Sequence, residues 1–166
     1  ELFARARRHG ARLIAAHFPR AYVDVNRAAE ELDPHMFETP IVPSGGRSAR
    51  VAAGLGVIPR IVRDGIEIYR GRLPAREAQH RLEHFYHPYH RALSELVESS
   101  LARFERAILI DCHSMPSQAH AKDIVLGDCF GASASPALTA RIEALLTGLG
   151  FSVGRNAPYA GGHTTS

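Results

Sequence analysis

Apolar residues recur at helical spacing through the middle of the chain, and this pattern predicts one long helix. Pro74 suits the first turn of a helix, and the apolar positions after it lie three or four residues apart as far as about Glu105. Pro88 lies inside this stretch and predicts a kink there. Residues 1–9 have the charged, amphipathic pattern of a helix end, which Gly10 would close.

A second helix is predicted near the end of the chain, and shorter apolar runs predict strands. Ser135 and Pro136 supply an N-cap and a first-turn proline for a helix through Leu149. The predicted strands cover residues 11–18, 22–26, 107–113, 123–128 and 151–156.

Asp64 and Gly65 form a turn signal between two apolar stretches, residues 56–62 and 66–71, and so predict a β-hairpin. Residues 27–50 are rich in Pro, Gly and Ser and predict a long surface loop or partial lid. Strands that alternate with helices favour an α/β fold with a mostly parallel sheet covered on both faces.

The composition favours one globular domain without a membrane partner. The chain has 166 residues, of which 45% are hydrophobic, and this suffices for one core. No stretch approaches the roughly 18 consecutive apolar residues of a membrane span, and the first ten residues lack the apolar core of a signal peptide. Cys112 and Cys129 are too few for a disulfide framework or a cysteine-rich zinc site, which predicts a cytoplasmic location.

The formal charge of +3 comes almost wholly from arginine, since Lys122 is the only lysine among 20 basic residues. Arginine suits bidentate binding of carboxylates or phosphates, although a bias in coding composition would produce the same excess. The basic residues are scattered and form no stripe with interleaved aromatics, so we expect no nucleic-acid partner.

One predicted strand, residues 107–113, runs into Asp111, Cys112, His113 and Ser114. Neighbours along a strand point to opposite faces, which argues against Cys112 as a nucleophile activated by the adjacent histidine. Asp111 and His113 share a face, and a carboxylate that orients a histidine is typical of a metal ligand. A structural histidine with satisfied hydrogen bonds is the alternative.

Four histidines within eleven positions of the predicted long helix could form a metal patch: His80, His84, His87 and His90. Zinc sites usually take their ligands from separated elements, so a solvated helix surface is the alternative, with His90 as the main exception.

Elsewhere, Asn26 and Arg27 offer an amide and a guanidinium for a substrate carboxylate, or a purely structural arginine. Tyr159 precedes Gly161 and Gly162 in a stretch that could close over a ligand or form a plain turn.

Seven motifs, in this order, resemble the N-formylglutamate amidohydrolase family: YVDVNR, GLGVIPR, IYRGRL, YHPYHRAL, LIDCHSMPS, DIVLGDCFG and NAPYAGGHTTS. The most specific are DCHSMPS and the DIVLGD that follows it. The family is similar in fold to zinc carboxypeptidases and aspartoacylases. The resemblance therefore implies a three-layer α/β/α sandwich around a mixed, mostly parallel sheet. It also implies hydrolysis of N-formyl-L-glutamate, a small-molecule N-acyl amino acid, to formate and glutamate in histidine degradation.

The resemblance implies roles for individual residues. His113 would bind zinc or another divalent metal, with Asp111 as its supporting carboxylate at the catalytic site and Cys112 as a packed bystander. By analogy with carboxypeptidases, Asn26 and Arg27 would bind a substrate carboxylate. A second substrate carboxylate needs a second cation, for which the candidates are Arg60 and Arg70, and Tyr159 is a further candidate for substrate binding.

Two parts of the family pattern have no counterpart in these 166 residues. One is an HSG-type segment with a downstream acid, which supplies the other zinc ligands. The other is an EINR-type segment, whose glutamate is the expected general base. The chain also starts at Glu1 inside a predicted helix and ends in a predicted loop. We therefore expect a piece of a larger hydrolase domain that is inactive alone.

Three hypotheses follow from the sequence. The first is a zinc amidohydrolase of N-formylglutamate, and the second is a hydrolase of another N-acyl amino acid or short peptide on the same scaffold. The third is a non-enzymatic binding protein with an incomplete metal site.

Overall fold

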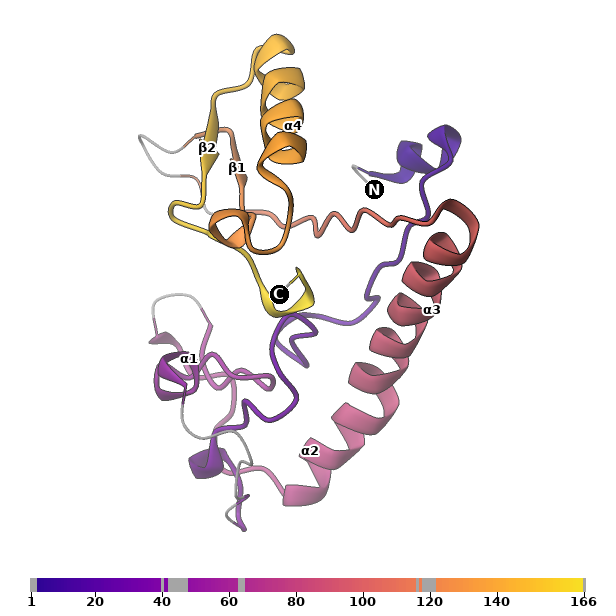
Figure 1. The fold of residues 1–166 in the computed structure, drawn as a ribbon. Coiled ribbons are helices and arrows are strands. Elements are labelled where there is room, and N and C mark those ends of the chain that lie inside the picture. Colours follow the sequence, from indigo (N-terminus) through magenta and orange to yellow (C-terminus); the bar gives the residue numbers. More distant parts are fainter. Residues whose placement is uncertain are drawn as a thin grey trace. The chain divides into compact units, whose positions relative to one another are not determined.

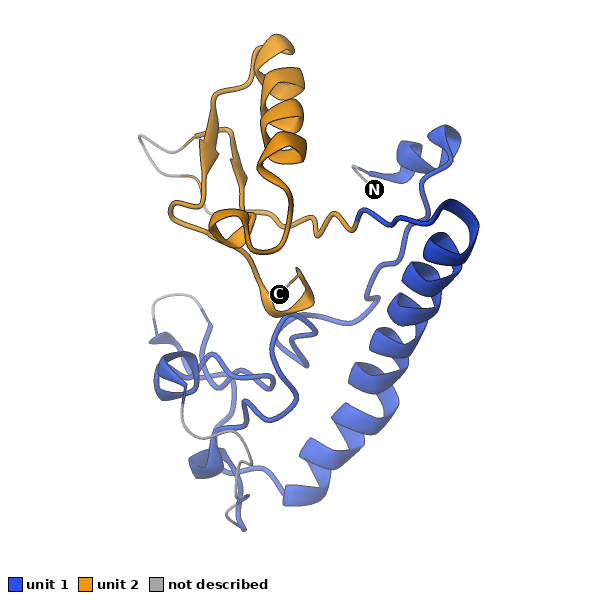
Figure 2. Ribbon diagram, viewed as in Figure 1, with its two compact units in different colours: residues 1–108 blue, residues 109–166 orange. Residues whose placement is uncertain are grey.

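The computed structural model describes residues 3–39, 41, 48–62, 65–115, 117 and 122–165. The chain divides into two compact units, Glu1–Ile108 and Leu109–Ser166, which Figure 2 shows in different colours. Helices occur in both, and a small parallel sheet occurs in the second, so the predicted mixed α/β class is confirmed. The expected single domain and the three-layer sandwich stay predictions.

The long helix of the first unit confirms the strongest pattern in the sequence (Figure 1). It consists of α2 (Ala75–Arg81), a π-helical segment (Leu82–Tyr86) and α3 (His87–Phe104). The π-helical segment ends two residues before Pro88, where the sequence predicts a kink. Proline lacks an N–H donor, and a wider turn is one way in which a helix accommodates that loss. Within the described residues, none of the helices combines the length and apolarity needed to cross a membrane.

The core of the first unit forms where loops pack on the start of this helix. Ala78 and Tyr86 are its contributions from the helix. The other buried members come from the loops before it, namely Val23, Leu32, Met36, Phe37, Val57 and Ile58. Short helical turns punctuate these loops, namely η1 (Ala4–His9), η2 (Pro34–Met36) and α1 (Ala49–Ala52). Gly10 closes η1 with a φ of 83°, as predicted.

Two predicted strands of the first unit are wrong. Residues 11–18 are irregular and mostly exposed, and they form no ladder with the described residues. Residues 22–26 form turns, and side chains of the long helix occupy backbone carbonyls that a strand would use for pairing. Alternating apolar residues therefore reflect burial against a helix here, not sheet formation.

Among the described residues, the predicted hairpin is limited to one antiparallel bridge, between Ile61 and Glu67. Val62 N–H donates to Ile66 O at 2.9 Å, and Gly65 has a φ of 75°. Asp64 lies outside the described residues, as do residues 42–47 of the predicted loop. The described residues on either side of the predicted turn pair at only one bridge, so they do not form strands.

The second unit holds the only sheet among the described residues. β1 (Ile124–Leu126) and β2 (Val153–Arg155) pair in parallel, with Val125 opposite Gly154. The crossover between them is α4 (Pro136–Gly148), whose N-cap Ser135 accepts a hydrogen bond from Leu138 N–H. These elements confirm the predicted helix and the last two predicted strands.

The predicted central strand at residues 107–113 is wrong for the described part of the chain. The segment has no ladder partner there, and its apolar side chains face solvent, with Ile110 67% exposed. A strand needs a neighbour to take up its backbone hydrogen bonds, and the sequence of the segment alone cannot supply one.

Candidate active site

In the first unit, the segment Tyr22–Arg27 places the predicted carboxylate binders Asn26 and Arg27. Asp24 fixes the segment locally: its N–H donates to Val57 O at 2.7 Å, and its carboxylate accepts from Asn26 N–H at 3.0 Å. Arg20 Nε donates to the same carboxylate at 2.9 Å. Asn26 is buried, so its backbone is held inside the unit.

The Arg27 guanidinium makes the contacts of a structural arginine. Nε donates to Leu55 O at 3.1 Å, Nη1 donates to Asn26 O at 2.7 Å, and Asp24 Oδ2 lies 3.7 Å from Nε. Burial lowers the pKa of Arg27, against the opposing field of Asp24, but a guanidinium stays charged at neutral pH. Nη2 makes no hydrogen bond within the described residues. Arg27 therefore has a structural role, and the Nη2 edge of its guanidinium remains for a ligand.

The two candidates for the second cation differ in their surroundings. Arg60 Nε pairs with Asp33 at 3.1 Å and its Nη1 with Glu67 at 3.2 Å, so two acids already offset its charge. Arg70 is exposed and forms no ion pair among the described residues. Arg70 is thus better suited to bind an added anion.

In the second unit, Asp111 and His113 lie together as their alternation predicts. His113 Nε2 lies 2.7 Å from Asp111 Oδ2. The intervening Cys112 is exposed and not packed as expected, and its thiol donates weakly to Ile110 O at 3.8 Å. Partial desolvation of the thiol, with a contribution from Asp111, raises its pKa. This geometry favours an oriented histidine over a cysteine nucleophile.

A network around Asp128 follows β1, and sequence reasoning missed it. Its carboxylate accepts from Asn156 Nδ2 at 2.8 Å, Thr139 Oγ1 at 2.8 Å and Gly131 N–H at 3.1 Å. These hydrogen bonds, that of Asn156 first, lower the pKa of Asp128. The signal in the sequence was an acid at the end of a predicted strand, whereas the positive φ of Cys129 is visible only in the structure.

The same strand end holds the loop that carries Tyr159. Cys129 N–H donates to Ala160 O at 2.7 Å, and a Cβ on Gly127 would lie 2.7 Å from the backbone of Ala160. Tyr159 itself is exposed. Its loop is therefore anchored by backbone contacts while its ring stays accessible.

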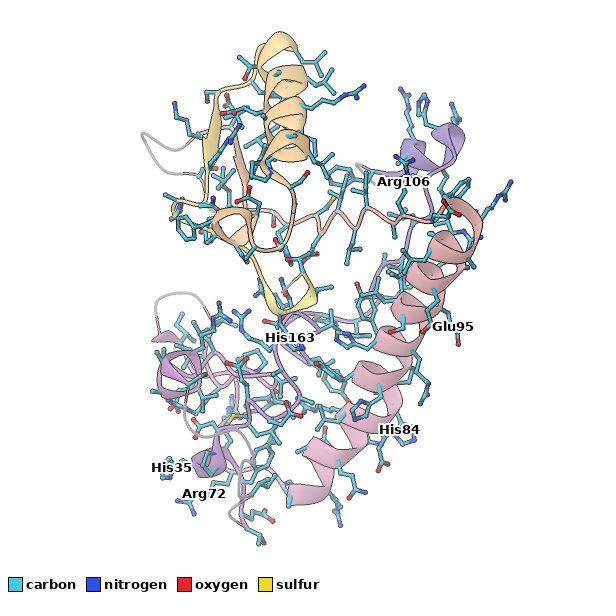
Figure 3. All side chains as sticks on the ribbon, in the orientation of Figure 1. His35, Arg72, His84, Glu95, Arg106 and His163 are labelled. Atoms are coloured by element: carbon cyan, nitrogen blue, oxygen red, sulfur yellow. The ribbon has the colours of Figure 1, made fainter. Side chains whose placement is uncertain are left out.

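Of the four histidines of the long helix, His90 differs from the others in its burial, as the sequence suggested. His80 and His84 are exposed and stack with ring centroids 4.4 Å apart (His84 is labelled in Figure 3). His87 is exposed, whereas His90 is partly buried and its Nε2 lies 2.9 Å from Val25 O. Across the part of the chain that the structure describes, no group of three or more His, Cys, Asp or Glu side chains could hold a metal ion.

Comparisons with known proteins identify the family. The model of the N-formylglutamate amidohydrolase family matches residues 1–166. This chain belongs to that family. An N-formylglutamate deformylase from Pseudomonas aeruginosa is 34% identical over 165 residues, which cover 94% of this chain and 56% of the relative. One from Pseudomonas putida is 28% identical over 174 residues, or 99% of this chain and 60% of the relative.

A solved member of the N-formylglutamate amidohydrolase family has a similar fold. The crystal structure of N-formylglutamate amidohydrolase from Ralstonia eutropha JMP134 matches with a TM-score of 0.79 and 34% identity, over 87% of this chain and 55% of that one. The chain thus spans a little over half the length of the relatives that it matches.

Proposed function

We propose that this chain is part of a zinc-dependent amidohydrolase that converts N-formyl-L-glutamate and water to formate and L-glutamate. The family match over residues 1–166 carries the proposal, and the two relatives called N-formylglutamate deformylase support the substrate. In the reaction, the formyl C–N bond breaks, the water oxygen bonds to the formyl carbon, and a proton goes to the departing amine.

The donor chemistry at His113 fits one zinc ligand. In a neutral imidazole whose Nε2–H donates to Asp111, Nδ1 carries the lone pair, and a carboxylate partner of this kind orients ligating histidines. Zinc usually takes four ligands, so we expect the others outside the described residues. When bound, zinc lowers the pKa of a water ligand to about 7 and polarises the formyl oxygen.

The remaining roles fall to cations of the first unit. Arg27, with Asn26 beside it, binds one substrate carboxylate through the Nη2 edge that its structural contacts leave open. Arg70 is the better candidate for the second carboxylate, because Asp33 and Glu67 already pair with Arg60. Tyr159 contributes an exposed phenol to the substrate site.

We also propose the three-layer sandwich for a protein as long as the relatives. In it, residues 107–112 pair with strands from the part of the relatives that this chain does not cover. Support comes from the extended, apolar segment itself, which exposes Ile110 and Ile108. Slow amide hydrogen exchange at residues 107–112 in the protein at its natural length is expected, and exchange at the rate of a random coil would contradict it.

We also propose a cytoplasmic location, which the unpaired thiols of Cys112 and Cys129 support.

The test is formate release by the purified protein at its natural length. N-formyl-L-glutamate is compared with N-acetyl-L-glutamate and N-formyl-L-glutamine, and bound metal is measured in the same samples. His113→Ala should abolish both activity and stoichiometric metal. His84→Ala, which removes an exposed histidine of the long helix, is the matched control and should change neither.

Each other outcome selects an alternative. Faster hydrolysis of another N-acyl amino acid would replace the substrate but keep the reaction. Saturable binding of N-formylglutamate without formate release, even with added zinc, would favour a binding protein. Stoichiometric metal retained in His113→Ala would remove His113 from the metal site.

A further inference from the structure

Three side chains of the long helix hold backbone carbonyls of the segment Tyr22–Arg27. Arg81 Nη1 donates to Tyr22 O at 2.9 Å, and Tyr86 Oη donates to Arg27 O at 2.7 Å. His90 Nε2 lies 2.9 Å from Val25 O, and a carbonyl oxygen can only accept, so this nitrogen carries the proton. These contacts span 59 to 65 positions of sequence.

The π-helical segment explains why these three donors share one side of the helix. In a regular α-helix, residues five apart point in different directions, whereas the i to i+5 repeat of a π-helix aligns them. The π-helical segment Leu82–Tyr86 directly follows Arg81 and ends at Tyr86, and His90 follows one α-helical turn later. An irregular helical turn of this kind is frequent at functional sites.

The held carbonyls belong to the residues around the proposed carboxylate binders. Val25 and Arg27 flank Asn26, and Asp24 fixes the opposite side of the segment through Val57 O. Tyr86 is buried, and burial raises its pKa to about 12, so its hydroxyl stays a donor at neutral pH. The backbone at Arg27 is thereby fixed before any substrate arrives.

We propose that Tyr86 and His90 are positioning residues, which set the backbone of Asn26 and Arg27 so that the Arg27 fork meets a substrate carboxylate. This inference rests on the proposed function. Arg81 is part of the same arrangement but is also buried against Glu77 and Tyr69, so its loss would disturb the core.

Tyr86→Phe in the protein at its natural length tests the proposal, because it removes one hydroxyl and keeps the ring. The KM for N-formyl-L-glutamate should rise about 5- to 20-fold, with kcat changed less than about 3-fold, because a binding group is displaced while the reacting centre is intact. In an Arg27→Ala background the same change should have no further effect on kcat/KM.

Two matched controls separate positioning from general packing. Tyr22→Phe also removes a hydroxyl from this cluster, and that hydroxyl makes no hydrogen bond among the described residues, so KM should change less than about twofold. His90→Gln should raise KM as Tyr86→Phe does, whereas His87→Gln, at an exposed position of the same helix, should not. His90→Gln also serves if Tyr86→Phe does not fold.

Unchanged KM in both Tyr86→Phe and His90→Gln, or losses additive with Arg27→Ala, would overturn the proposal. If the wild-type protein does not hydrolyse N-formylglutamate, the proposed function fails, and amide hydrogen exchange at residues 22–27 decides the positioning separately. Exchange should then be faster in Tyr86→Phe than in Tyr22→Phe, and equal rates would overturn it.

Discussion

The imidazole Nε2 of His113 lies 2.7 Å from Oδ2 of Asp111, two positions earlier in an extended segment. A carboxylate in this position holds the ring in one orientation and makes its other nitrogen a stronger ligand. We expect Asp111→Asn to weaken zinc binding about 10- to 100-fold, as the loss of such partners typically does. Competition with a chromophoric chelator measures this affinity. Asp123→Asn, which changes an exposed carboxylate of the same unit, is the control, and equal affinities in the two variants would contradict a supporting role for Asp111.

Cys112 should be dispensable for hydrolysis. Its thiol contacts the Ile110 carbonyl, while His113 is engaged with Asp111, so no base faces the sulfur within this segment. Cys112→Ala should retain kcat/KM within about threefold, since a small exposed side chain is replaced by a slightly smaller one. A loss of activity of a thousandfold or more with the fold intact would restore the cysteine nucleophile.

Local signals in the sequence were sufficient for the helices. Apolar spacing predicted the long helix to within a residue or two at each end, and Ser135 with Pro136 predicted the start of α4. Capping and periodicity act over a few residues, so the chain itself contains the information. The same holds for β1 and β2, where α4 provides the crossover that brings them together.

The missed features depend on distant partners. Residues 22–26 alternate like a strand, yet Arg81 and His90 of the long helix bind two of their backbone carbonyls. A local sequence pattern cannot predict that a distant side chain will be the hydrogen-bond partner. Residues 107–113 have the sequence of a strand without a neighbouring strand in the described chain. At the candidate site, alternation alone predicted the pairing of Asp111 with His113, whereas the structural contacts of Arg27 to Leu55 O required the folded loops.

Gly127 should tolerate no side chain, because it lies where β1 meets the loop that carries Tyr159. A Cβ there would approach backbone atoms of Ala160 and Gly161 to 2.7–2.9 Å, and backbone cannot move aside as a flexible side chain can. Gly127→Ala should lower the free energy of unfolding by about 1–3 kcal/mol. Gly148→Ala, at a helical position where a Cβ meets nothing, should raise it by up to about 1 kcal/mol. Urea unfolding measures both, and equal effects would show that the contact at Gly127 relaxes.

Asp128 should make stability depend on acidic pH. Hydrogen bonds from Asn156 and Thr139 hold its pKa below the usual 3.8, so its contribution to stability is present above pH 4 and is lost as the pH falls through the lowered pKa. Asp128→Asn should therefore be less stable than the wild type at pH 7, and the difference should shrink towards pH 3. The exposed Glu95 (Figure 3) supplies the control, since Glu95→Gln should leave the pH profile unchanged. A stability difference independent of pH would mean that the charge of Asp128 is not what the network binds.

Arg27 separates a hydrolase of an acidic substrate from a general metal amidase. Loss of a charge-assisted pair costs about 2–5 kcal/mol when the partner charge is left buried, so Arg27→Ala should lower kcat/KM about 30-fold to several thousandfold. Arg27→Lys should recover only part of this loss, because an ammonium group cannot reproduce the fork.

The structural contacts of Arg27 require a control for folding. Arg27→Ala also removes the hydrogen bonds to Leu55 O and Asn26 O, so activity could fall because the loops rearrange. A substrate analogue whose α-carboxylate is replaced by an amide resolves the two causes. On the wild-type protein the analogue should lose about as much kcat/KM as the mutation does, whereas on Arg27→Ala it should lose little more, since the missing carboxylate has no partner left. Losses that add in full would mean that Arg27 does not touch that carboxylate, that its role is confined to the loops, and that Arg70 or another arginine binds the substrate.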